Sequence, residues 1–429
     1  MRRQRGLVGL TGLAALVGLG LVARPTVAQV TTNMVVTTEQ GASILVFPKV
    51  IADGSRDTII QITNTSNDMW NLHCFYVNGA PTIPGDPPTY LPGSANLPLC
   101  METDFDIYLT REQPTHWVVS TGRLYNPSDE DCSQGPPPVT CCSLSAASCP
   151  GNSGVSGSDA ADCCDAGYDP GHVPPVAPDF TGELMCMVVD SGGMPVPRAN
   201  IIKGEATLED VVTGDVSKYN AIGIQGYEIA PAQVDDGVVI CLGSNGAPDP
   251  TLCPNGYSYP ACPQEWRLDH PATGAPDPVY DQLSSCPSPP CSSVSTNLTV
   301  VPCTQNFETQ ALTVVGMQFL VTNEFEQQFT TSTSFACWGS FDLGAPTGSL
   351  LPGISSWFTA GALGSSTLHT RIRSTSDTPG GMLAVIEETH QIIASGYTAR
   401  SAQNGHMIMG QTNVDLVTIP LGQVAIPPE

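Results

Sequence analysis

The sequence is poor in basic residues and contains almost no lysine. The 429-residue chain has 15 Lys and Arg against 40 Asp and Glu, and its only lysines are Lys49, Lys203 and Lys218. Such an acidic surface repels nucleic acid and anionic lipid, so no nucleic-acid partner is expected. Charged residues are only 13% of the chain and apolar ones 41%, which is typical of a folded protein and not of a charge-rich disordered one.

Motifs for well-known chemistries are also missing. The sequence has no Gly-x-Ser-x-Gly, no His-Glu-x-x-His and no Cys-x-x-Cys-His, so nucleophilic, zinc-hydrolase and haem chemistry have no support. We assign no catalytic residue, no cofactor and no firm metal ligand. No segment of ten or more residues keeps a helical period, and after residue 28 no apolar run approaches the roughly 20 residues of a membrane span.

The N-terminus has the three parts of a secretory signal. Arg2, Arg3 and Arg5 precede an apolar run over 6–22, and the small residue Ala28 marks the expected cleavage point. Loss of residues 1–28 leaves 11 basic residues against 40 acidic ones, a net charge of −29. We therefore expect a secreted, extracellular or cell-surface protein, with the periplasm as the alternative compartment.

Short stretches of alternating apolar and polar residues predict β-strands. The clearest are 58–64, 70–77, 104–110 and 367–373. Turn residues separate these stretches, and the pattern favours an all-β fold, specifically an antiparallel β-sandwich of one or two domains. In 70–77 the alternation places His73 on the solvent-facing side. In 104–110 the same kind of alternation places Asp104 and Asp106 on one face, which explains their spacing without an active site.

Cysteines divide the chain into regions. Six fall in the Pro/Gly/Ser-rich insert 128–178, six lie in or at the edge of 243–303, and four accompany strand-like segments. An exported chain with even local counts predicts disulfides, with each insert cross-linked to itself and the connectivity left open. The predicted disulfide cysteines are Cys74, Cys100, Cys132, Cys141, Cys142, Cys149, Cys163, Cys164, Cys186, Cys241, Cys253, Cys262, Cys286, Cys291, Cys303 and Cys337.

The expected organisation follows from these regions. A signal peptide over 1–28 precedes an N-terminal β-sandwich region over 29–242, which carries the insert 128–178. A Pro/Cys-rich insert over 243–303 then leads to a C-terminal β region over 304–429. The sequence leaves open whether the two β regions form one domain or two.

Three groups of residues are weak candidates for binding. One is an acidic loop that could supply oxygen ligands to calcium, although the Asp-x-Asp-x-Asp-Gly pattern is absent; it contains Asp159, Asp162, Asp165 and Asp169. The second is a basic strand face that could dock a carboxylate-bearing partner; it contains His369, Arg371 and Arg373. The third is an aromatic set suited to interfaces; it contains Tyr257, Tyr259, Trp266 and Tyr280.

Several strand segments resemble a group of secreted bacterial proteins of unassigned function. The resemblance is carried by ILVFPKV from Ile44, DTIIQITN from Asp57, HCFYVN from His73, DFDIYLT from Asp104, GELMCMVVD from Gly182, GEATLED from Gly204, YNAIG from Tyr219, TNEFEQQFTTS from Thr322 and TRIRS from Thr370. It covers about half of the chain and implies an immunoglobulin-like module and export. It implies no catalytic residue.

These observations favour a non-catalytic structural, adhesive or binding protein of the cell surface or exterior, with an unknown partner or a second copy as its target. Two alternatives remain open. One is an exported glycan or peptide hydrolase that uses paired carboxylates, and the other is a calcium-binding surface-layer component.

Overall fold

A computed structural model describes most of the chain beyond the predicted signal peptide. The described residues are 35–80, 100–123, 171–227, 229–234, 237–243, 250–283, 285–344, 358–375, 380–409 and 414–421. Residues 34–429 form one compact unit. The predicted signal peptide, the calcium candidates Asp159, Asp162, Asp165 and Asp169, and the six cysteines between Cys132 and Cys164 lie outside the described residues.

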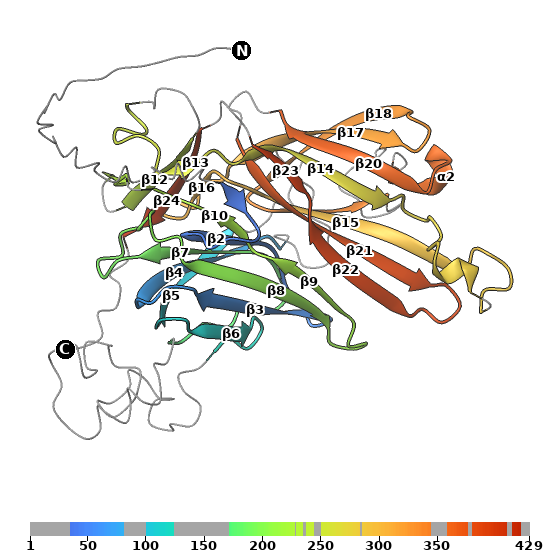
Figure 1. Ribbon diagram of the computed structural model, residues 1–429, viewed down its shortest axis with the longest axis horizontal. Coiled ribbons are helices and arrows are strands. Elements are labelled where there is room, and N and C mark those ends of the chain that lie inside the picture. The colour runs from blue at the N-terminus through green and yellow to red at the C-terminus, as the bar shows by residue number, and fades with distance from the viewer. Residues whose placement is uncertain are drawn as a thin grey trace, which may run out of the picture. The chain divides into compact units, whose positions relative to one another are not determined.

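The regular secondary structure of the described residues is almost entirely β-strand (Figure 1). The α-helix α2 (Ala360–Leu363) and the 3-10 helix η3 (Tyr280–Gln282) are each a single turn. The strands are β1 (Val36–Thr37), β2 (Ile44–Ala52), β3 (Arg56–Asn64), β4 (Trp70–Asn78), β5 (Met101–Leu109), β6 (Pro114–Val118), β7 (Phe180–Val189), β8 (Ile202–Asp210), β9 (Val216–Asn220), β10 (Ile222–Ile224), β11 (Ala232–Val234), β12 (Gly237–Gly243), β13 (Tyr259–Pro260), β14 (Pro263–Pro271), β15 (Ser292–Pro302), β16 (Gln305–Asn306), β17 (Val314–Asn323), β18 (Gln328–Ala336), β19 (Gly339–Leu343), β20 (Thr367–Ser374), β21 (Met382–Ile392), β22 (Thr398–Asn404), β23 (His406–Met409) and β24 (Val414–Pro420).

The strands divide among five small sheets. Their orders are β1-β10-β2-β7-β4-β5, β11-β12-β24-β16 with β13 beside β12, β18-β17-β20-β14-β23, β19-β15-β21-β22, and β6-β3-β8-β9. The all-β class is confirmed, but the expected immunoglobulin-like sandwich is wrong: the arrangement is a five-bladed β-propeller of small, mainly antiparallel sheets. These blades are not consecutive four-stranded meanders, because strands such as β2 and β7 or β12 and β24 come from distant parts of the chain.

Burial follows the alternation that the sequence shows. In β17 every second side chain is buried, with Val315, Met317, Phe319 and Val321 facing inward. β2 is buried along its whole length, because it pairs with β10 and β7 and both of its faces are covered. An uninterrupted apolar run at 44–47 suits that position.

Two large apolar cores hold the sheets together. One core includes Leu45, Ile60 and Leu208, and it lies between the sheet that contains β2 and the sheet that contains β3. The other core includes Trp266 and Phe319 and is shared by the remaining sheets and the opposite face of β2. The strand β2 therefore contributes to both cores.

The stretch 243–303 is more ordered than its composition predicts. It supplies β14 and β15 to two sheets, and Tyr259, Trp266 and Leu298 within it are completely buried. This stretch, expected from the sequence as a Pro/Cys-rich insert between two β regions, therefore contributes buried strands of its own. Proline and cysteine flank the strands, and the apolar residues inside them are spaced too widely to stand out in the composition.

Five disulfides join the cysteines of the described residues. The bonds Cys241–Cys253, Cys262–Cys303 and Cys286–Cys291 close within one stretch, which confirms the expected local cross-linking there. The remaining four cysteines pair with each other, as Cys74–Cys186 and Cys100–Cys337. These two bonds join segments far apart in sequence, with separations of 112 and 237 residues.

Candidate functional site

A buried histidine lies between two carboxylates on β4 and β5. His73 is directly opposite Asp106 in the strand register; its Nδ1 lies 3.1 Å from Asp106 Oδ1 and its Nε2 lies 3.5 Å from Asp104 Oδ2. Burial alone would lower the pKa of His73, but hydrogen bonds to both carboxylates and their charges outweigh burial and raise the pKa to about 9. His73 is therefore an imidazolium at neutral pH.

The expected solvent exposure of His73 is wrong, since only 3% of its surface is accessible. On the same face of β4, the His73 ring stacks on Phe75, and Phe75 stacks on Phe307 just beyond β16. A segment more than 200 residues further along the chain therefore helps to cover this face. Strand alternation correctly separated His73 from Leu72 and Cys74, but it carried no information about what covers the other face.

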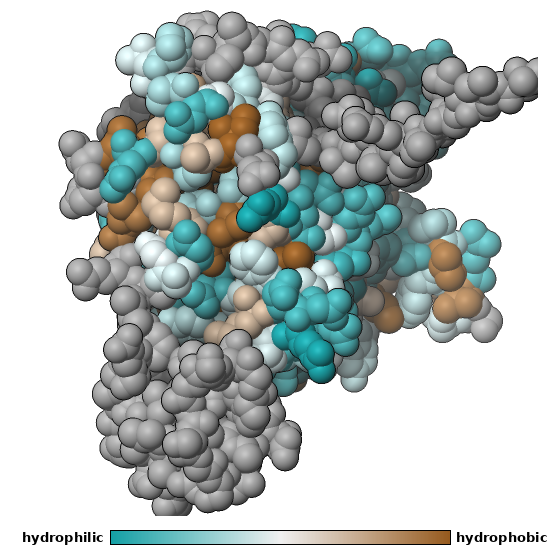
Figure 2. All heavy atoms as spheres, turned by 60° about the vertical axis from the view of Figure 1, so that its left-hand side comes forward, coloured by the Kyte–Doolittle hydropathy of each residue, from teal (hydrophilic) through white to brown (hydrophobic). Residues whose placement is uncertain are grey.

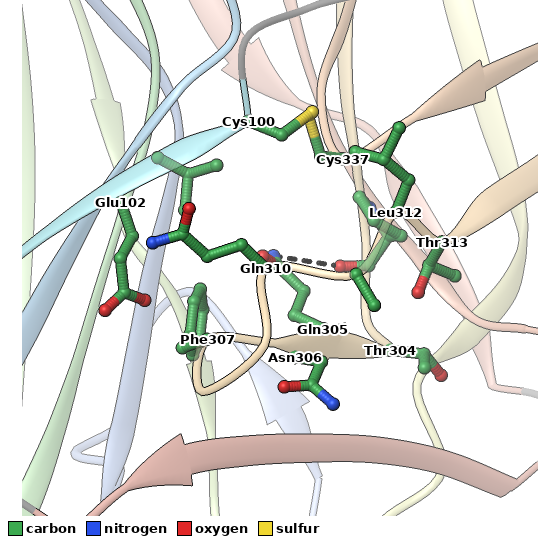
Figure 3. Close-up of a pocket in the computed structure, with 13 residues that line it drawn as sticks. Cys100, Glu102, Thr304, Gln305, Asn306, Phe307, Gln310, Leu312, Thr313 and Cys337 are labelled. Atoms are coloured by element: carbon green, nitrogen blue, oxygen red, sulfur yellow. Dashed lines mark hydrogen bonds between the residues drawn. A yellow bond between two sulfur atoms is a disulfide. The ribbon is translucent and has the colours of Figure 1, made fainter.

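A small cavity lies beside this cluster, below the Cys100–Cys337 disulfide (Figure 3). Glu102, Gln305, Phe307 and Gln310 line it. Burial, with the nearby charge of Asp104, raises the pKa of Glu102 to about 7. The cavity volume is about 20 Å³, which is room for about one water molecule. A glycan or peptide substrate therefore has no place beside these carboxylates.

A second buried carboxyl, Glu183 on β7, lies on the same face. The side chain of Gln305 donates to its Oε1, while its Oε2 has no hydrogen-bond partner. Burial raises the pKa of Glu183 to about 8, against the opposing effect of the bond from Gln305. Glu183 is therefore predominantly a neutral carboxylic acid at pH 7.

Replacing Glu183 with glutamine is expected to weaken the pH dependence of stability. The unfolded carboxyl ionises near 4.5 and the folded one near 8, so the free energy of unfolding falls as the pH rises between these values. Glutamine can accept the same bond but cannot ionise. In urea denaturation, Glu183→Gln should gain stability relative to the wild type between about pH 5 and about pH 9. The exposed change Glu39→Gln is the control, and an equal gain there would contradict the assignment.

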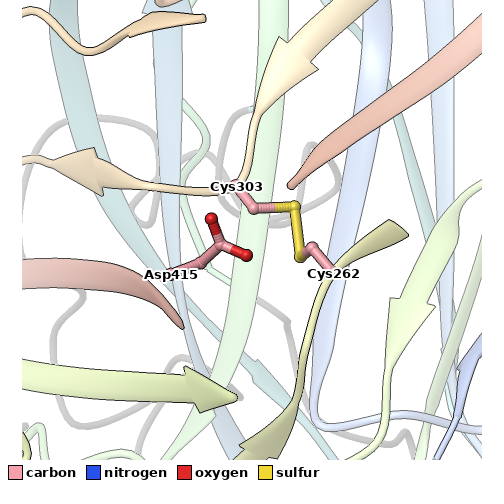
Figure 4. A group of neighbouring side chains, drawn as sticks. All are labelled: Cys262, Cys303 and Asp415. Atoms are coloured by element: carbon pink, nitrogen blue, oxygen red, sulfur yellow. A yellow bond between two sulfur atoms is a disulfide. The ribbon is translucent and has the colours of Figure 1, made fainter. Parts of the chain in front are cut away.

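One buried grouping of potential metal ligands within the described residues is not a metal site. Cys262, Cys303 and Asp415 are buried together, but the two cysteines are bonded to each other (Figure 4). Their sulfur atoms are therefore not thiolates. Asp415 accepts hydrogen bonds from the backbone of Gly381 and the hydroxyl of Thr304, so it fastens two loops beside the disulfide.

A larger open groove lies along β3, β8 and β9. Its volume is about 460 Å³, and its lining is mostly polar: Thr38, Glu39, Gln40, Leu45, Gln61, Thr63, Lys203, Gly204, Glu205, Asn220 and Ala221. The lining has no His, Cys or Ser, so it offers no Ser–His or Cys–His pair, and its carboxyl groups are those of Glu39 and Glu205. Glu205 forms a 3.0 Å ion pair with Lys218. The groove therefore has the size of a ligand site and a polar lining.

The predicted basic face exists but is matched by acidic side chains of the neighbouring strand. Across from β20, the strand β14 pairs Asp269 with His369 at 2.6 Å and Glu265 with Arg371. Arg373 donates from Nε to Gln318 Oε1 at 2.6 Å. A carboxylate-bearing partner would have to compete with these internal partners.

The predicted aromatic contact surface is wrong. Tyr257, Tyr259 and Trp266 are buried, and Trp266 donates from its indole nitrogen to the carbonyl oxygen of Met382 at 2.8 Å. Only Tyr280 is partly exposed, on η3. The aromatic side chains of this stretch therefore pack in the core and do not form an exposed interface.

Comparison with known proteins adds no family. No family model matches the chain, and no curated protein matches it. Among solved structures, a viral chemokine binding protein R17 encoded by rodent gammaherpesvirus Peru aligns over 88% of both chains, with 7% identity and a TM-score of 0.16. That likeness is too low to support an argument. In the part of the chain that the structure describes, no helix has the length and apolar character to cross a membrane.

Proposed function

We propose that this protein is a non-catalytic structural or adhesive protein that works outside the cytoplasm. The observation that carries the proposal is the set of five disulfides, because stable cross-links of this number are typical of oxidising compartments. The cavity beside the carboxyl group of Glu102 has room for about one water molecule, which supports a non-catalytic role. Rigid β-sheets of this kind commonly present loops for binding.

The contact surface that we propose is a stapled tip, defined here as Val279, Leu283, Ile393 and Tyr397. These side chains are 73%, 49%, 56% and 71% exposed. The Cys286–Cys291 disulfide closes the loop before β15, and Ile393 N donates to Cys291 O at 2.9 Å, so this loop and the β21–β22 turn lie together. On the face drawn in Figure 2, by contrast, apolar groups are interspersed with hydrophilic ones.

The tip is held rigidly, which favours binding because little order has to be gained. Asp281 accepts a 2.6 Å hydrogen bond from Ser292 Oγ at the start of β15. Asp277 accepts from Val279 N and Tyr280 N and also contacts His390 Nδ1 at 2.8 Å. These contacts fix the apolar side chains in an exposed position.

Changing Ile393 and Tyr397 to serine should weaken binding strongly while leaving the fold intact. Exposed anchors of this size contribute enough for a loss of about tenfold or more in affinity. We suggest measuring binding on a glycan array and on a panel of immobilised extracellular proteins, and self-association by sedimentation. The matched control is Val211→Ser with Val212→Ser, an exposed apolar pair at the β8–β9 turn. Equal binding by the tip variant and the wild type would contradict the proposed surface.

A hydrolase screen tests the main alternative. The same preparation should release no product from glycan or peptide substrates if the protein is non-catalytic. Turnover by the wild type would overturn the proposed function and would direct attention to the polar groove, where Glu39 and Glu205 are the acidic lining residues.

A further inference from the structure

A lysine, an asparagine and a glutamate from three strands far apart in sequence meet in a buried position, with the asparagine directly opposite the glutamate in the register of β15 and β21. Lys49 on β2 is 3% exposed and Glu387 on β21 is 3% exposed. Lys49 Nζ lies 2.6 Å from Asn297 Oδ1 on β15 and 2.9 Å from Glu387 Oε2. Lys49 is one of only three lysines in the chain, and Lys203 and Lys218 are exposed. Burial of this one lysine against an amide therefore requires an explanation.

The charges around Lys49 favour its neutral amine. Arg56 already holds Glu387 with two bonds of 2.9 and 2.5 Å, and Ser217 Oγ donates to the same carboxylate at 2.6 Å. Two cations thus share one anion, and loss of a proton from Lys49 removes the excess charge. Burial, together with the charge of Arg56, lowers the pKa of Lys49 against the opposing effect of Glu387. A neutral amine is the nucleophilic form of lysine.

The hydrogen bonds around Asn297 draw electron density toward its Oδ1, which makes its Cγ more open to attack by an amine. Its Oδ1 accepts from Lys49 and from Thr299 Oγ1 at 3.2 Å, and Ser340 Oγ lies 3.1 Å away. Its Nδ2 donates to Asp342 Oδ1 at 2.6 Å. The carboxylate of Asp342 can only accept, so the amide nitrogen of Asn297 faces Asp342 and the amide oxygen faces Lys49. Asp342 is exposed, which places the amide nitrogen toward solvent.

We propose that Lys49 and Asn297 join in an intramolecular amide bond that cross-links β2 to β15. The amine nitrogen of Lys49 adds to Cγ of Asn297, and the hydroxyls of Thr299 and Ser340 stabilise the charge that develops on Oδ1. Glu387 Oε2, which lies 2.9 Å from Nζ, takes the proton that Nζ loses. The departing nitrogen gains one proton on its other side, where Asp342 Oδ1 and Ser340 Oγ lie 2.6 and 3.0 Å from Nδ2, so no net proton is gained or lost. The bond from Cγ to Nδ2 breaks, and ammonia leaves on the side of Asp342. One C–N bond forms and one breaks, so no oxidant, water or cofactor is needed.

The cross-link would tie two blades across 248 residues of sequence. β2 belongs to the six-stranded sheet and β15 to the sheet β19-β15-β21-β22, and the disulfides of the described residues leave these two strands unlinked to each other. An amide also survives reduction, so it would hold these sheets together where disulfides are cleaved.

Peptide mapping of the full-length wild-type protein tests whether the bond between Lys49 and Asn297 exists. After reduction, alkylation and digestion, mass spectrometry should find the Lys49 peptide joined to the Asn297 peptide, lighter than their sum by one ammonia. The intact reduced protein should show the same deficit. Recovery of folded wild-type protein with both peptides separate and unmodified would overturn the proposal.

Variants of Lys49, Asn297 and Glu387 test the role of each residue in forming the cross-link. Asn297→Ala and Lys49→Arg should both yield the separate, unlinked peptides, whereas Lys203→Arg, which removes an exposed lysine, should keep the cross-link. Glu387→Gln should lose the cross-link or form it much more slowly. Formation at the wild-type rate in Glu387→Gln would overturn the role of Glu387 as proton acceptor. The wild-type map remains decisive if any of these variants fails to fold.

Discussion

Glu387→Gln is expected to lower the free energy of unfolding by about 3–5 kcal/mol, which is the usual cost of removing one partner from a buried ion pair. The glutamine keeps the shape but leaves the guanidinium of Arg56, whose side chain is 14% exposed, without its charge partner. Arg56 stays charged whether or not Lys49 is bonded to Asn297, so the loss is expected in either state. Guanidinium denaturation at neutral pH, with folding checked by circular dichroism, measures it.

The control is an exposed ion pair of the same type. Glu205→Gln removes the partner of Lys218, whose side chain is 55% exposed, and should change stability by less than about 1 kcal/mol.

The stabilisation that Glu387 contributes should also depend on pH. Despite burial, the hydrogen bonds and charge of Arg56 and the hydrogen bond from Ser217 lower the pKa of Glu387 below its usual value of 4.5, and any charge on Lys49 acts in the same direction. Its stabilisation is therefore present above that value and is lost as the pH falls. Equal costs for the two variants would contradict this account.

Local sequence patterns predicted strands but could not predict how the strands combine. The alternation at 58–64 and 104–110 is realised in β3 and β5 because each strand has one covered face. The assignment of strands to sheets depends on pairings such as β12 with β24, more than 170 residues apart. Nothing in either strand's own sequence encodes that partner, so a two-sheet sandwich and five small sheets are equally consistent with the alternation.

The same limit applies to the buried polar groups. Glu387 lies three residues from His390 in a strand, and alternation correctly predicts that the two side chains point to opposite faces. It does not predict that Glu387 lies opposite Asn297 in its own sheet and meets Lys49 and Arg56, which come from two other sheets. The scarcity of lysine was the available signal, since a chain with three lysines that places one in a strand-like apolar run has an unusual residue to explain.

Loss of the Cys100–Cys337 disulfide should produce the second large effect on stability. Its cysteines are separated by 237 residues, and in the chain-entropy model a bond across a loop of this length stabilises by roughly 5 kcal/mol. Other bridges already shorten the loop, so we expect the double change Cys100→Ser with Cys337→Ser to cost about 4 kcal/mol in denaturant unfolding. The bond also anchors the start of β5, the edge strand that carries Glu102 and Asp104.

The Cys286–Cys291 bond provides the matched comparison, because its cysteines are only five residues apart. Its removal by the corresponding pair of serines should cost about 2 kcal/mol, since the entropy of the unfolded chain depends on the logarithm of loop length. The two variants also differ in what they disturb: the first loosens a junction between sheets, and the second loosens the stapled tip. Stability should therefore fall more in the first, and binding should fall more in the second. A reversed order in stability would show that the long bond contributes little to the folded protein, and that packing of the two cores holds β5 in place without it.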